Sequence, residues 1–385
     1  MNDQMDNNIK IATDNGSGSL FDKIVSLIEQ ARARVATAVN TAEVYTKFHI
    51  GQFIIENEQG GLERAPYGKA ILKDLSLKLT KRFGNGWSVE NLTLFRKFYL
   101  TYSSHNSGEA KIVNTVCEIE KVEKDTPCLP NSTIVGSTID TAPSFLLSWS
   151  HYLVLMRIKD EKARSFYEIE CAQQNWSVRQ LQRQYNSSLY ERLALSRNKA
   201  EVIRLATEGQ TIEKSADVIK NPLSLEFLGL KPDESYSESK LEGAIISRMK
   251  DFLLEMGKGF LFEARQKRFT FEEEFFYVDL VLYNRLLQCY CLIDFKIDKL
   301  THQDLGQMQM YVNYFDRYVK QAFEKPTIGI LICREKKDAL VELTLPKNAN
   351  IYATEYQIYL PDKQLLESKL KEWIDEYEDD ANITE

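Results

Sequence analysis

The stretch that decides the fold of the C-terminal half is FYVDLVLYNRLLQCYCLIDFK, residues 276–296. Side chains in its first part, YVDLVLY (277–283), alternate between two faces, as in a β-strand. Its second part, QCYCLIDF (288–295), is apolar on both faces, which is typical of a central buried strand. Cys289 and Cys291 share one face of that strand and are predicted to be small core side chains. The stretch therefore predicts two neighbouring strands at the centre of a folded domain.

The segments on either side predict the rest of this domain. Apolar residues at helical spacing mark a helix over 241–256. A β-rich run over 260–271 precedes the quoted stretch, residues 302–322 return to helical spacing, and TIGILIC (327–333) is another buried strand. The order α-β-β-β-α-β predicts an α/β domain with a mixed sheet over residues 240–371.

Two aspartates and a lysine interrupt the apolar pattern. Asp279 lies in the middle of the first quoted strand, Asp294 ends the second, and Lys296 follows two residues later. The strand period of two places Asp294 and Lys296 on one face, and neighbouring strands lie about 4.8 Å apart. Burying these charges in apolar strands is costly unless they pair with one another or hold a metal ion.

The residues alone leave both explanations open. In the first, Asp279 and Asp294 hold Mg²⁺ or Mn²⁺, because hard cations of this kind bind through one or two carboxylates plus substrate phosphate. Glu242 on the preceding helix could reach the same ion, and Lys296 would position or help deprotonate a water that attacks a phosphodiester. In the second, Asp294 and Lys296 form a buried ion pair, and Asp279 is a hydrogen-bonded core residue.

The N-terminal half is predicted to be helical. Residues 1–18 are polar and rich in Gly and Ser, which predicts a disordered leader. Helical spacing covers 19–206 apart from a stretch rich in Ser, Thr, Gly and Pro at 103–143, which predicts a flexible surface insertion. Two prolines and several turn formers predict a linker over 207–239. The chain ends in an acidic tail, 372–385.

Two similar sequences occur in the helical half. GWSVENL (86–92) and NWSVRQL (175–181) each place a serine before a new helix, where it can act as the N-cap. The candidate nucleic-acid-binding residues on these helices are Arg96, Lys97, Arg179 and Arg183. A Ser-capped helix with outward arginines is how a helix-turn-helix presents its recognition helix to DNA, although plain helical bundles carry the same pattern.

The composition excludes several classes of protein. A chain of 385 residues with 43% hydrophobic and 27% charged residues is typical of a globular protein with two domains. It contains no apolar run of 18 residues and does not begin with a secretory signal, so we expect a cytoplasmic protein without a membrane partner. The six cysteines and four histidines lack zinc-ligand spacing, so any metal should be held by carboxylates.

The net charge of −7 would argue against nucleic-acid binding if it were spread over the chain. It is concentrated in the acidic tail, which carries seven acids and no Lys or Arg. The rest of the chain is formally neutral, so only the local clusters of basic residues bear on the question.

The C-terminal half resembles the nuclease domain of the YhcG family, within the PD-(D/E)xK, or restriction-endonuclease-like, superfamily. The resemblance is carried by LEGAIISRMKDFLLEMGKGF, by the quoted stretch, and by DLGQMQMYVNYFD, TIGILIC and ATEYQIYLP. It extends into the helical half through YGKAILKDLSLKLTKRFGNGWSVENLTLFRKFYL and LSWSHYLVLMRIKDEKARSFYEIECAQQNWSVRQLQRQYNSSLYERL. It implies a two-domain α+β protein with an N-terminal helical, helix-turn-helix-like DNA-binding domain.

The resemblance also implies a set of catalytic residues. Asp279 falls on the first strand aspartate of the superfamily, Asp294 on the (D/E) position, Lys296 on the lysine, and Glu242 on the helix-borne glutamate. Gln307 and Tyr311 fall on a Q-x-x-x-Y element of the following helix, where their i, i+4 spacing places them on one face. Asp279, Asp294 and Glu242 would be the metal ligands.

One residue departs from the family pattern. YhcG-like sequences usually have Glu-x-Lys where this chain has Asp294-Phe295-Lys296. Asp is shorter by one methylene, so a bound metal would have to shift by about 1 Å or recruit a water, and such a shift can affect the rate.

The resemblance therefore predicts a Mg²⁺- or Mn²⁺-dependent DNA endonuclease that acts in DNA processing, recombination or repair, or defence against foreign DNA. The alternative is a DNA-binding or protein-interaction module whose nuclease fold has lost activity. We expect DNA as the partner, a homodimer as in many nucleases of this fold, and no small-molecule cofactor. The choice between DNA and RNA and the target sequence are not determined by the sequence.

Overall fold

The computed structural model describes residues 20–60, 65–103, 145–195, 199–231, 236–346 and 348–382. The predicted leader, and the predicted insertion apart from Ser103, lie outside the described residues. The chain divides into two compact units, Met1–Tyr152 and Leu153–Glu385. This boundary differs from the expected one, because the helices after residue 153 belong to the same unit as the sheet.

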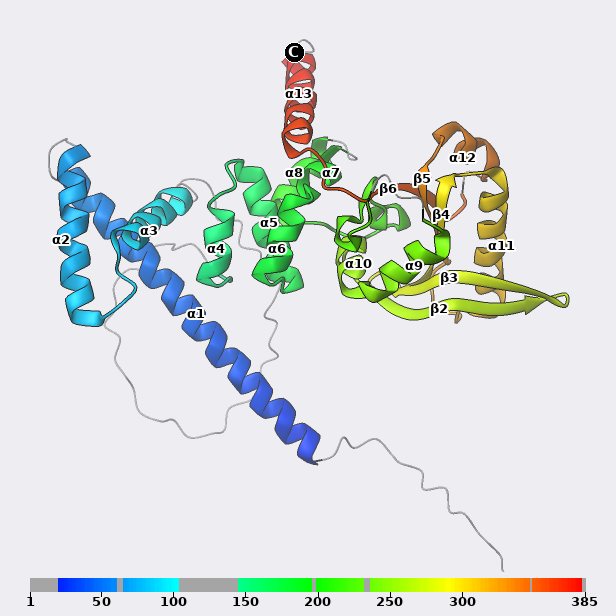
Figure 1. Ribbon diagram of the computed structural model, residues 1–385, viewed down its shortest axis with the longest axis horizontal. Helices are drawn as coiled ribbons and strands as arrows, with labels where there is room; N and C mark the ends of the chain where they lie inside the picture. Colours follow the sequence, from blue (N-terminus) through cyan, green and yellow to red (C-terminus); the bar gives the residue numbers. More distant parts are fainter. Residues whose placement is uncertain are drawn as a thin grey trace, which may run out of the picture. The chain divides into compact units, whose positions relative to one another are not determined.

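The first unit is helical, as predicted (Figure 1). Its elements are α1 (Leu20–Gly60), α2 (Ala65–Phe83), α3 (Val89–Tyr102) and the start of α4 (Trp149–Leu155). Ser88 caps α3, because its side chain accepts a hydrogen bond from the backbone N of Asn91 at 3.3 Å. Aromatic rings hold α1 and α3 together, with the Phe48 and Phe98 centroids 5.8 Å apart. A Cβ at Gly51 would lie 2.1 Å from the Phe95 carbonyl oxygen, so only glycine allows this approach.

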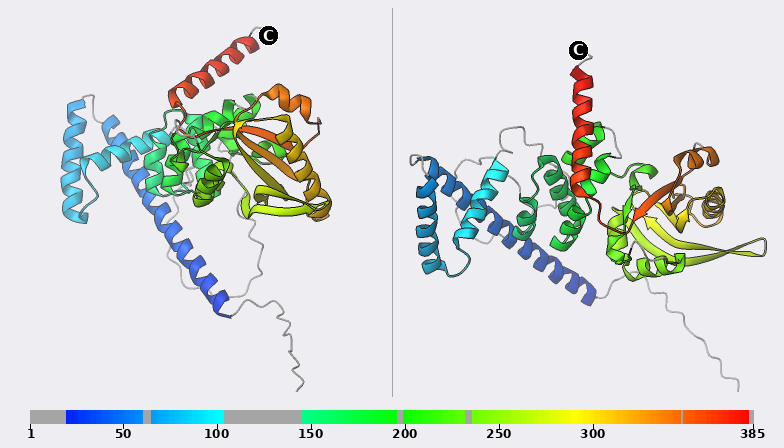
Figure 2. Two further views of the ribbon diagram at one scale, coloured as in Figure 1. Left: turned by 45° about the vertical axis from the view of Figure 1, so that its right-hand side comes forward. Right: turned by 45° about the horizontal axis from the view of Figure 1, so that its top comes forward.

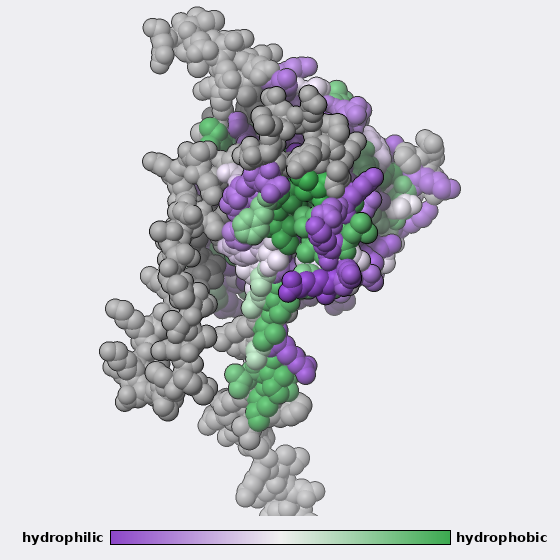
Figure 3. All heavy atoms as spheres, turned by 90° about the vertical axis from the view of Figure 1, so that its left-hand side faces the viewer, coloured by the Kyte–Doolittle hydropathy of each residue, from purple (hydrophilic) through white to green (hydrophobic). Residues whose placement is uncertain are grey.

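The N-terminal half of α1 carries exposed apolar side chains. Ile24, Leu27, Val35 and Val39 are between 46% and 67% exposed. Figure 3 shows hydrophobic atoms gathered along the narrow stalk that α1 forms on the face turned to the viewer. None of the helices in the described ranges is both long and apolar enough to cross a bilayer.

The second unit begins with four helices. They are α5 (Glu161–Gln174), α6 (Val178–Asn186), α7 (Leu189–Leu195) and α8 (Lys199–Glu208). Ser177 caps α6 as predicted: Gln180 N donates to Ser177 Oγ, and Ser177 N donates to Gln180 Oε1. The two similar sequences therefore share their N-cap, and the indole of Trp176 is buried beneath the second.

A six-stranded mixed sheet forms the centre of the second unit, which confirms the predicted fold class (Figure 2). Its strands are β1 (Leu223–Ser224), β2 (Phe260–Phe271), β3 (Glu274–Asn284), β4 (Cys289–Lys299), β5 (Ile328–Glu335) and β6 (Ile351–Gln357). Their order is β1-β6-β5-β4-β3-β2. The pairs β2–β3 and β3–β4 are antiparallel, and the pairs β4–β5, β5–β6 and β1–β6 are parallel.

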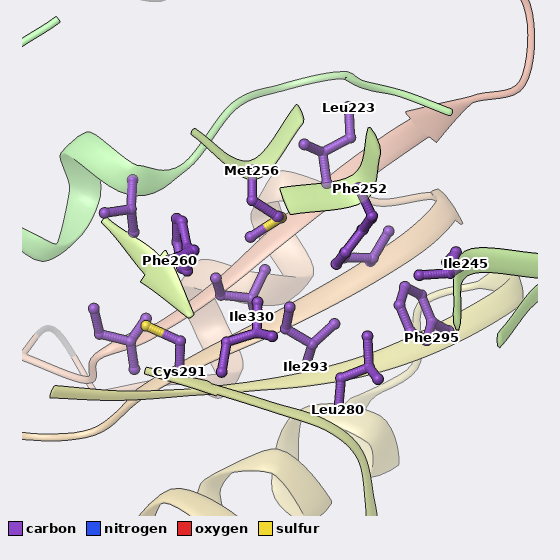
Figure 4. Packing of buried hydrophobic residues seen from close by; sticks show 14 of the residues in the cluster. Leu223, Ile245, Phe252, Met256, Phe260, Leu280, Cys291, Ile293, Phe295 and Ile330 are labelled. Atoms are coloured by element: carbon purple, nitrogen blue, oxygen red, sulfur yellow. The ribbon is translucent and has the colours of Figure 1, made fainter. Parts of the chain in front are cut away.

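Helices cover both faces of this sheet. The helices in this part are α9 (Glu238–Ser247), α10 (Met249–Met256), α11 (His302–Tyr318), α12 (Asp338–Thr344) and α13 (Lys363–Asn382). On one face, Ile245 and Phe252 of α9 and α10 pack against strand residues such as Ile293 (Figure 4). On the other face, α11 packs against β3, β4 and β5. The helix expected over 241–256 is divided at Arg248, which ends α9 and precedes α10.

The segment 207–239 differs from the linker expected there. Val218, Leu223 and Leu225 are at most 2% exposed and belong to the same core cluster as Phe252. Figure 4 shows Leu223 of β1 beside Phe252 of α10. The described part of this segment therefore belongs to the folded unit.

Candidate active site

The two aspartates of the predicted site lie where β3 and β4 separate. The pairing of these strands ends at Leu280↔Ile293, and the next residues in the same register are Asp279 and Asp294. Asp279 Oδ2 accepts a hydrogen bond from the backbone N of Phe295 at 2.9 Å. The carboxylate thus accepts a hydrogen bond from a backbone N–H group at the end of the ladder. The opening of the ladder brings both carboxyl groups to one place, as the sequence predicts.

Lys296 completes this arrangement. Its Nζ lies 2.7 Å from Asp294 Oδ2 and 3.8 Å from Asp304 Oδ1 at the start of α11. Phe295, between the two charged residues, is fully buried on the opposite face among the side chains of α9 and α10. The strand alternation therefore separates the core side chain from the reactive ones, as predicted.

The protonation states follow from burial and from like charge. Burial raises the pKa of Asp294, and the negative charge of Asp279 raises it further, to about 7, despite the nearby Lys296. For Lys296, burial alone would lower the pKa, but the Asp294 carboxylate outweighs that effect and the pKa is raised. Lys296 is therefore a cation at neutral pH, and the two carboxyl groups repel one another.

Glu242 joins the site through a residue that the sequence analysis did not identify. Gln266 Nε2 donates to Glu242 Oε2 and to Asp279 Oδ1, both at 2.9 Å, and Arg265 Nε lies 2.6 Å from Glu242 Oε1. Gln266 has a φ of 46°, unusual for a non-glycine residue in a strand. A polar residue in an exposed strand resembles any surface residue, so no local signal identifies it.

The donor set fits a hard divalent cation with few protein ligands. Asp279 and Asp294 offer carboxylate oxygens, and a cation between them would remove the repulsion that raises the pKa of Asp294. Within the described ranges, no three His, Cys, Asp or Glu side chains converge on one point. Mg²⁺ commonly takes only one or two carboxylates and keeps several waters. Glu242 as a third ligand stays a prediction, because its oxygens are bound by Arg265 and Gln266.

Gln307 and Tyr311 lie on α11 close to the aspartates. The Gln307 amide donates a hydrogen bond to the Tyr311 hydroxyl. Tyr311 is 1% exposed, burial raises its pKa, and the charges of Asp294 and Lys296 act on it. The two residues therefore share one helical face beside the site, as their spacing predicts, and Tyr311 also packs in the core.

The candidate nucleic-acid-binding residues divide into two groups. Lys97 on α3 and Arg179 on α6 are exposed, and Arg96 is half-buried. Arg183 corrects the prediction: its side chain is 13% exposed and lies 3.0 Å from Glu226 and 3.1 Å from Glu255. An arginine held by two carboxylates in the interior is not available to DNA.

Arg183 belongs to a second buried charge cluster, here named the Glu255 cluster, which comprises Glu255, Arg183, Arg192 and Lys220. Arg192 Nη1 lies 2.7 Å from Glu255 Oε1, and Lys220 donates to the backbone oxygen of Glu255. Burial alone would raise the pKa of Glu255, but Arg192, Lys220 and Arg183 together lower it to about 2. This cluster joins α6 and α7 to α10 within the second unit.

Comparison with known proteins covers both halves of the chain. Residues 216–371 match the family described as the YhcG PDDEXK nuclease domain. Residues 23–192 match the family described as the DUF1016 N-terminal domain. The chain is 36% identical over 356 residues to the Escherichia coli (strain K12) protein named "Putative nuclease YhcG", covering 92% of this chain and 94% of that protein.

Two solved structures share a weaker likeness. One is a repair endonuclease from Pyrococcus abyssi, with 19% identity and a TM-score of 0.22, and the other is an EndoMS–dsDNA complex, with 14% identity and a TM-score of 0.22. Each likeness covers 34% of this chain and 50% of the solved chain, and is too weak to bear on function. The two family matches and the E. coli relative confirm the resemblance found in the sequence, and the chain belongs to the YhcG family of PDDEXK nucleases.

Proposed function

We propose that the protein is a Mg²⁺- or Mn²⁺-dependent endonuclease that hydrolyses phosphodiester bonds in DNA. The observation that carries this proposal is the cluster at the end of the β3–β4 ladder, named here the site cluster: Asp279, Asp294, Lys296 and Glu242. A purely structural ion pair would need one acid for one base. The site cluster instead places a second acid, Asp279, beside the Asp294–Lys296 pair, and burial together with the charge of Asp279 raises the pKa of Asp294 to about 7.

Each residue of the site cluster has a distinct task in this proposal. Asp279 and Asp294 would hold the divalent ion, which when bound supplies positive charge to the scissile phosphate. Lys296 carries a raised pKa and so stays protonated. Of the two roles that the sequence left open, this favours positioning over proton removal: the ammonium orients the attacking water and the phosphate by charge and hydrogen bonds.

Gln266 and Gln307 are positioning residues in this scheme, and Glu242 is the predicted third metal ligand. Gln266 fixes the Asp279 carboxylate relative to Glu242, since one amide nitrogen donates to both. Gln307 lies beside the site on α11 and is held by Tyr311. Carboxylates that are already held in place need not be ordered when the substrate binds, so the entropic cost of orienting them is lower.

DNA binding is proposed for the exposed Lys97 and Arg179 and the half-buried Arg96 of the capped helices. Arg96 and Lys97 follow the Ser88 cap, and Arg179 follows the Ser177 cap. Side chains at these places could contact phosphates or base edges. A homodimer, as in many nucleases of this fold, would allow both strands to be cut. The proposal places the protein in the cytoplasm, in keeping with four unpaired buried cysteines in the described part of the chain.

Cleavage of plasmid and branched DNA tests the proposal. We expect cutting with Mg²⁺ or Mn²⁺ that disappears in Asp279→Ala and Lys296→Ala, while DNA binding measured by anisotropy survives. Asp338→Ala, on the exposed start of α12, is the matched control and should cut like the parent. If the parent cuts no DNA form with either ion, or if the site variants cut equally well, the enzymatic proposal is wrong.

A further inference from the structure

A hollow beside the site cluster has no role in the function proposed above. The β2–β3 ribbon extends beyond the sheet: β2 and β3 stay paired as far as Phe271↔Glu274, whereas β4 accompanies β3 only from Asn284 to Leu280. Figures 1 and 2 show the ribbon reaching past the other strands with α11 standing against it. Between the ribbon and α11 lies a cavity of about 330 Å³.

Four aromatic side chains line this cavity. Phe269 of β2 and Tyr314 of α11 stack with centroids 4.1 Å apart and planes at 22°. Phe271 and Tyr318 also line the cavity, and they are 43% and 64% exposed. Flat aromatic faces that remain open around one hollow are typical of a binding site for a flat ligand.

Polar groups at the same cavity define the kind of ligand. Gln309 lines it, and Gln309 Oε1 is buried without a hydrogen-bond donor among the described residues. An acceptor left without a donor is costly. A rotation of the Gln309 side chain would turn Oε1 toward the cavity, where a ligand N–H group would satisfy it. Arg317 also lines the cavity, and none of the described lining residues is acidic. The combination suits a ligand with a flat face, an N–H edge and a nearby negative charge.

The cavity lies close to the site cluster along both of its walls. On β2, Phe269 is three residues beyond Gln266, about 10 Å at the rise of a strand. On α11, Tyr311 lies between the two sites: its ring meets that of Phe269 edge-on at 5.4 Å, and its hydroxyl binds Gln307. A strand in B-form geometry advances about 3.4 Å per nucleotide and an extended strand advances further, so the cavity is within about three nucleotides of Gln266, which bonds the site cluster.

We propose that this cavity binds one unpaired base of the nucleic-acid substrate, within about three nucleotides of the bond that is cut. The base stacks on Phe271 and Tyr318, its edge donates to Gln309, and Arg317 contacts the adjacent phosphate. Because a paired base cannot enter, the cavity makes the enzyme prefer DNA with an unpaired strand, such as a flap, over blunt duplex. This inference rests on the proposed function, whose substrate class it narrows.

Fluorescent oligonucleotides test the proposal on the full-length protein in EDTA, where no cleavage occurs. A series of flap substrates carries a single 2-aminopurine at successive positions of the unpaired strand. We expect quenching by stacking at one position of the series, and loss of that quenching in Phe271→Ala and Tyr318→Ala. Each variant should bind the flap about 5- to 100-fold more weakly, the range expected for one stacked base, with blunt-duplex binding unchanged.

The controls separate this proposal from the catalytic one. Leu343→Ala removes an exposed apolar side chain, 88% exposed on α12, and should leave flap binding unchanged. Thermal unfolding checks that the aromatic variants fold. Equal losses for flap and blunt duplex, or no loss for either, would overturn the base-binding proposal, as would quenching that persists in both aromatic variants. If the quenching pattern holds but no DNA form is cut with either metal, the base site stands and the endonuclease proposal fails.

Discussion

The site cluster and the Glu255 cluster are both buried groups of acids and bases, yet their electrostatics are opposite. In the Glu255 cluster, one acid is surrounded by three cations, and its pKa falls to about 2. In the site cluster, Asp294 is buried beside a second aspartate and contacts one lysine, and burial and the charge of Asp279 together raise its pKa to about 7. The first arrangement is satisfied as folded, whereas the second lacks positive charge.

This difference separates a structural use of charge from a functional one. A buried acid that serves stability needs opposite charge and hydrogen bonds around it, and Glu255 has both, from two arginines and from the backbone N of Ser224. A site that must receive a cation is more useful when unbalanced, because binding then relieves repulsion. Carboxylates with a strongly shifted pKa in such an unbalanced site are typical of functional sites.

The largest expected effect comes from neutralising Asp294. Asp294→Asn should lower the cleavage rate by a factor on the order of 10³, which corresponds to about 4 kcal/mol. Its free energy of unfolding in EDTA should be unchanged or higher, because the like-charge repulsion with Asp279 is gone. Cleavage assays and urea unfolding measure the two quantities. A loss of stability above about 2 kcal/mol would mean that the aspartate serves the fold, and the contrast between the clusters would fail.

The opposite outcome is expected for Glu255. Glu255→Gln leaves Arg192 and Arg183 buried with less compensating charge, so the free energy of unfolding should fall by about 3–5 kcal/mol. Asp251→Asn, on the exposed side of the same helix, is the control and should change it by less than about 0.5 kcal/mol. Urea denaturation followed by circular dichroism measures both. Equal stabilities for the two variants would contradict the structural role of the cluster.

The two clusters should also respond to pH in opposite directions. Asp294 holds its proton more tightly in the folded chain, so its contribution to stability is full below its unfolded pKa of 3.8 and is lost as the pH rises toward 7. Glu255 holds its proton less tightly, so its contribution is present above 4.5 and is lost as the pH falls toward 2.

Melting temperatures in EDTA across the pH range measure these responses. The stability change between pH 4 and 7 should be at most about 4 kcal/mol, and Asp294→Asn should flatten that part of the profile. Glu255→Gln should flatten the acidic part. If Asp294→Asn flattened the acidic part of the profile and Glu255→Gln the part between pH 4 and 7, the assignment of the two pH responses to these carboxylates would be wrong.

The smallest effect is expected at the edge of the site cluster. The Arg265 side chain is 43% exposed, so Arg265→Ala should change the free energy of unfolding by less than about 1 kcal/mol. Removing its positive charge should raise the affinity for Mn²⁺ a few-fold, as measured by metal-dependent shifts of the melting temperature. Weaker metal binding in this variant would show that Arg265 is needed to hold Glu242 in place.

Local periodicity predicted most of the nuclease half. β2, most of which is exposed, was located by its β-rich composition, whereas periodicity located β3 by alternation and β4 and β5 by continuous apolar runs. It did not identify β6, where polar residues are mixed into IYATEYQ, or the two-residue strand β1. Both depend on parallel pairing with strands far away in the sequence, which no local pattern contains.

The site was predictable where the backbone alone sets the geometry. The register of two strands brings Asp279, Asp294 and Lys296 together, and that register follows from the apolar pattern. Gln266 and Arg183 were not predictable, because their roles depend on partners such as Glu255, 72 residues from Arg183. The sequence does contain a hint that Glu255 is buried: it lies three residues after Phe252, close to the apolar face of its helix.

The Glu255 cluster has a consequence for how this protein can be divided or recombined. One family match ends at Arg192 and the other begins at residue 216, so a cut between them separates both arginines from Glu255. A fragment with only the second half would expose a carboxylate shaped for two absent guanidinium groups. A chimera between relatives would need Arg183, Arg192 and Glu255 to come from the same parent. Arg183, Arg192 and Glu255 therefore form one physical unit, although the two family matches divide them between separate domains.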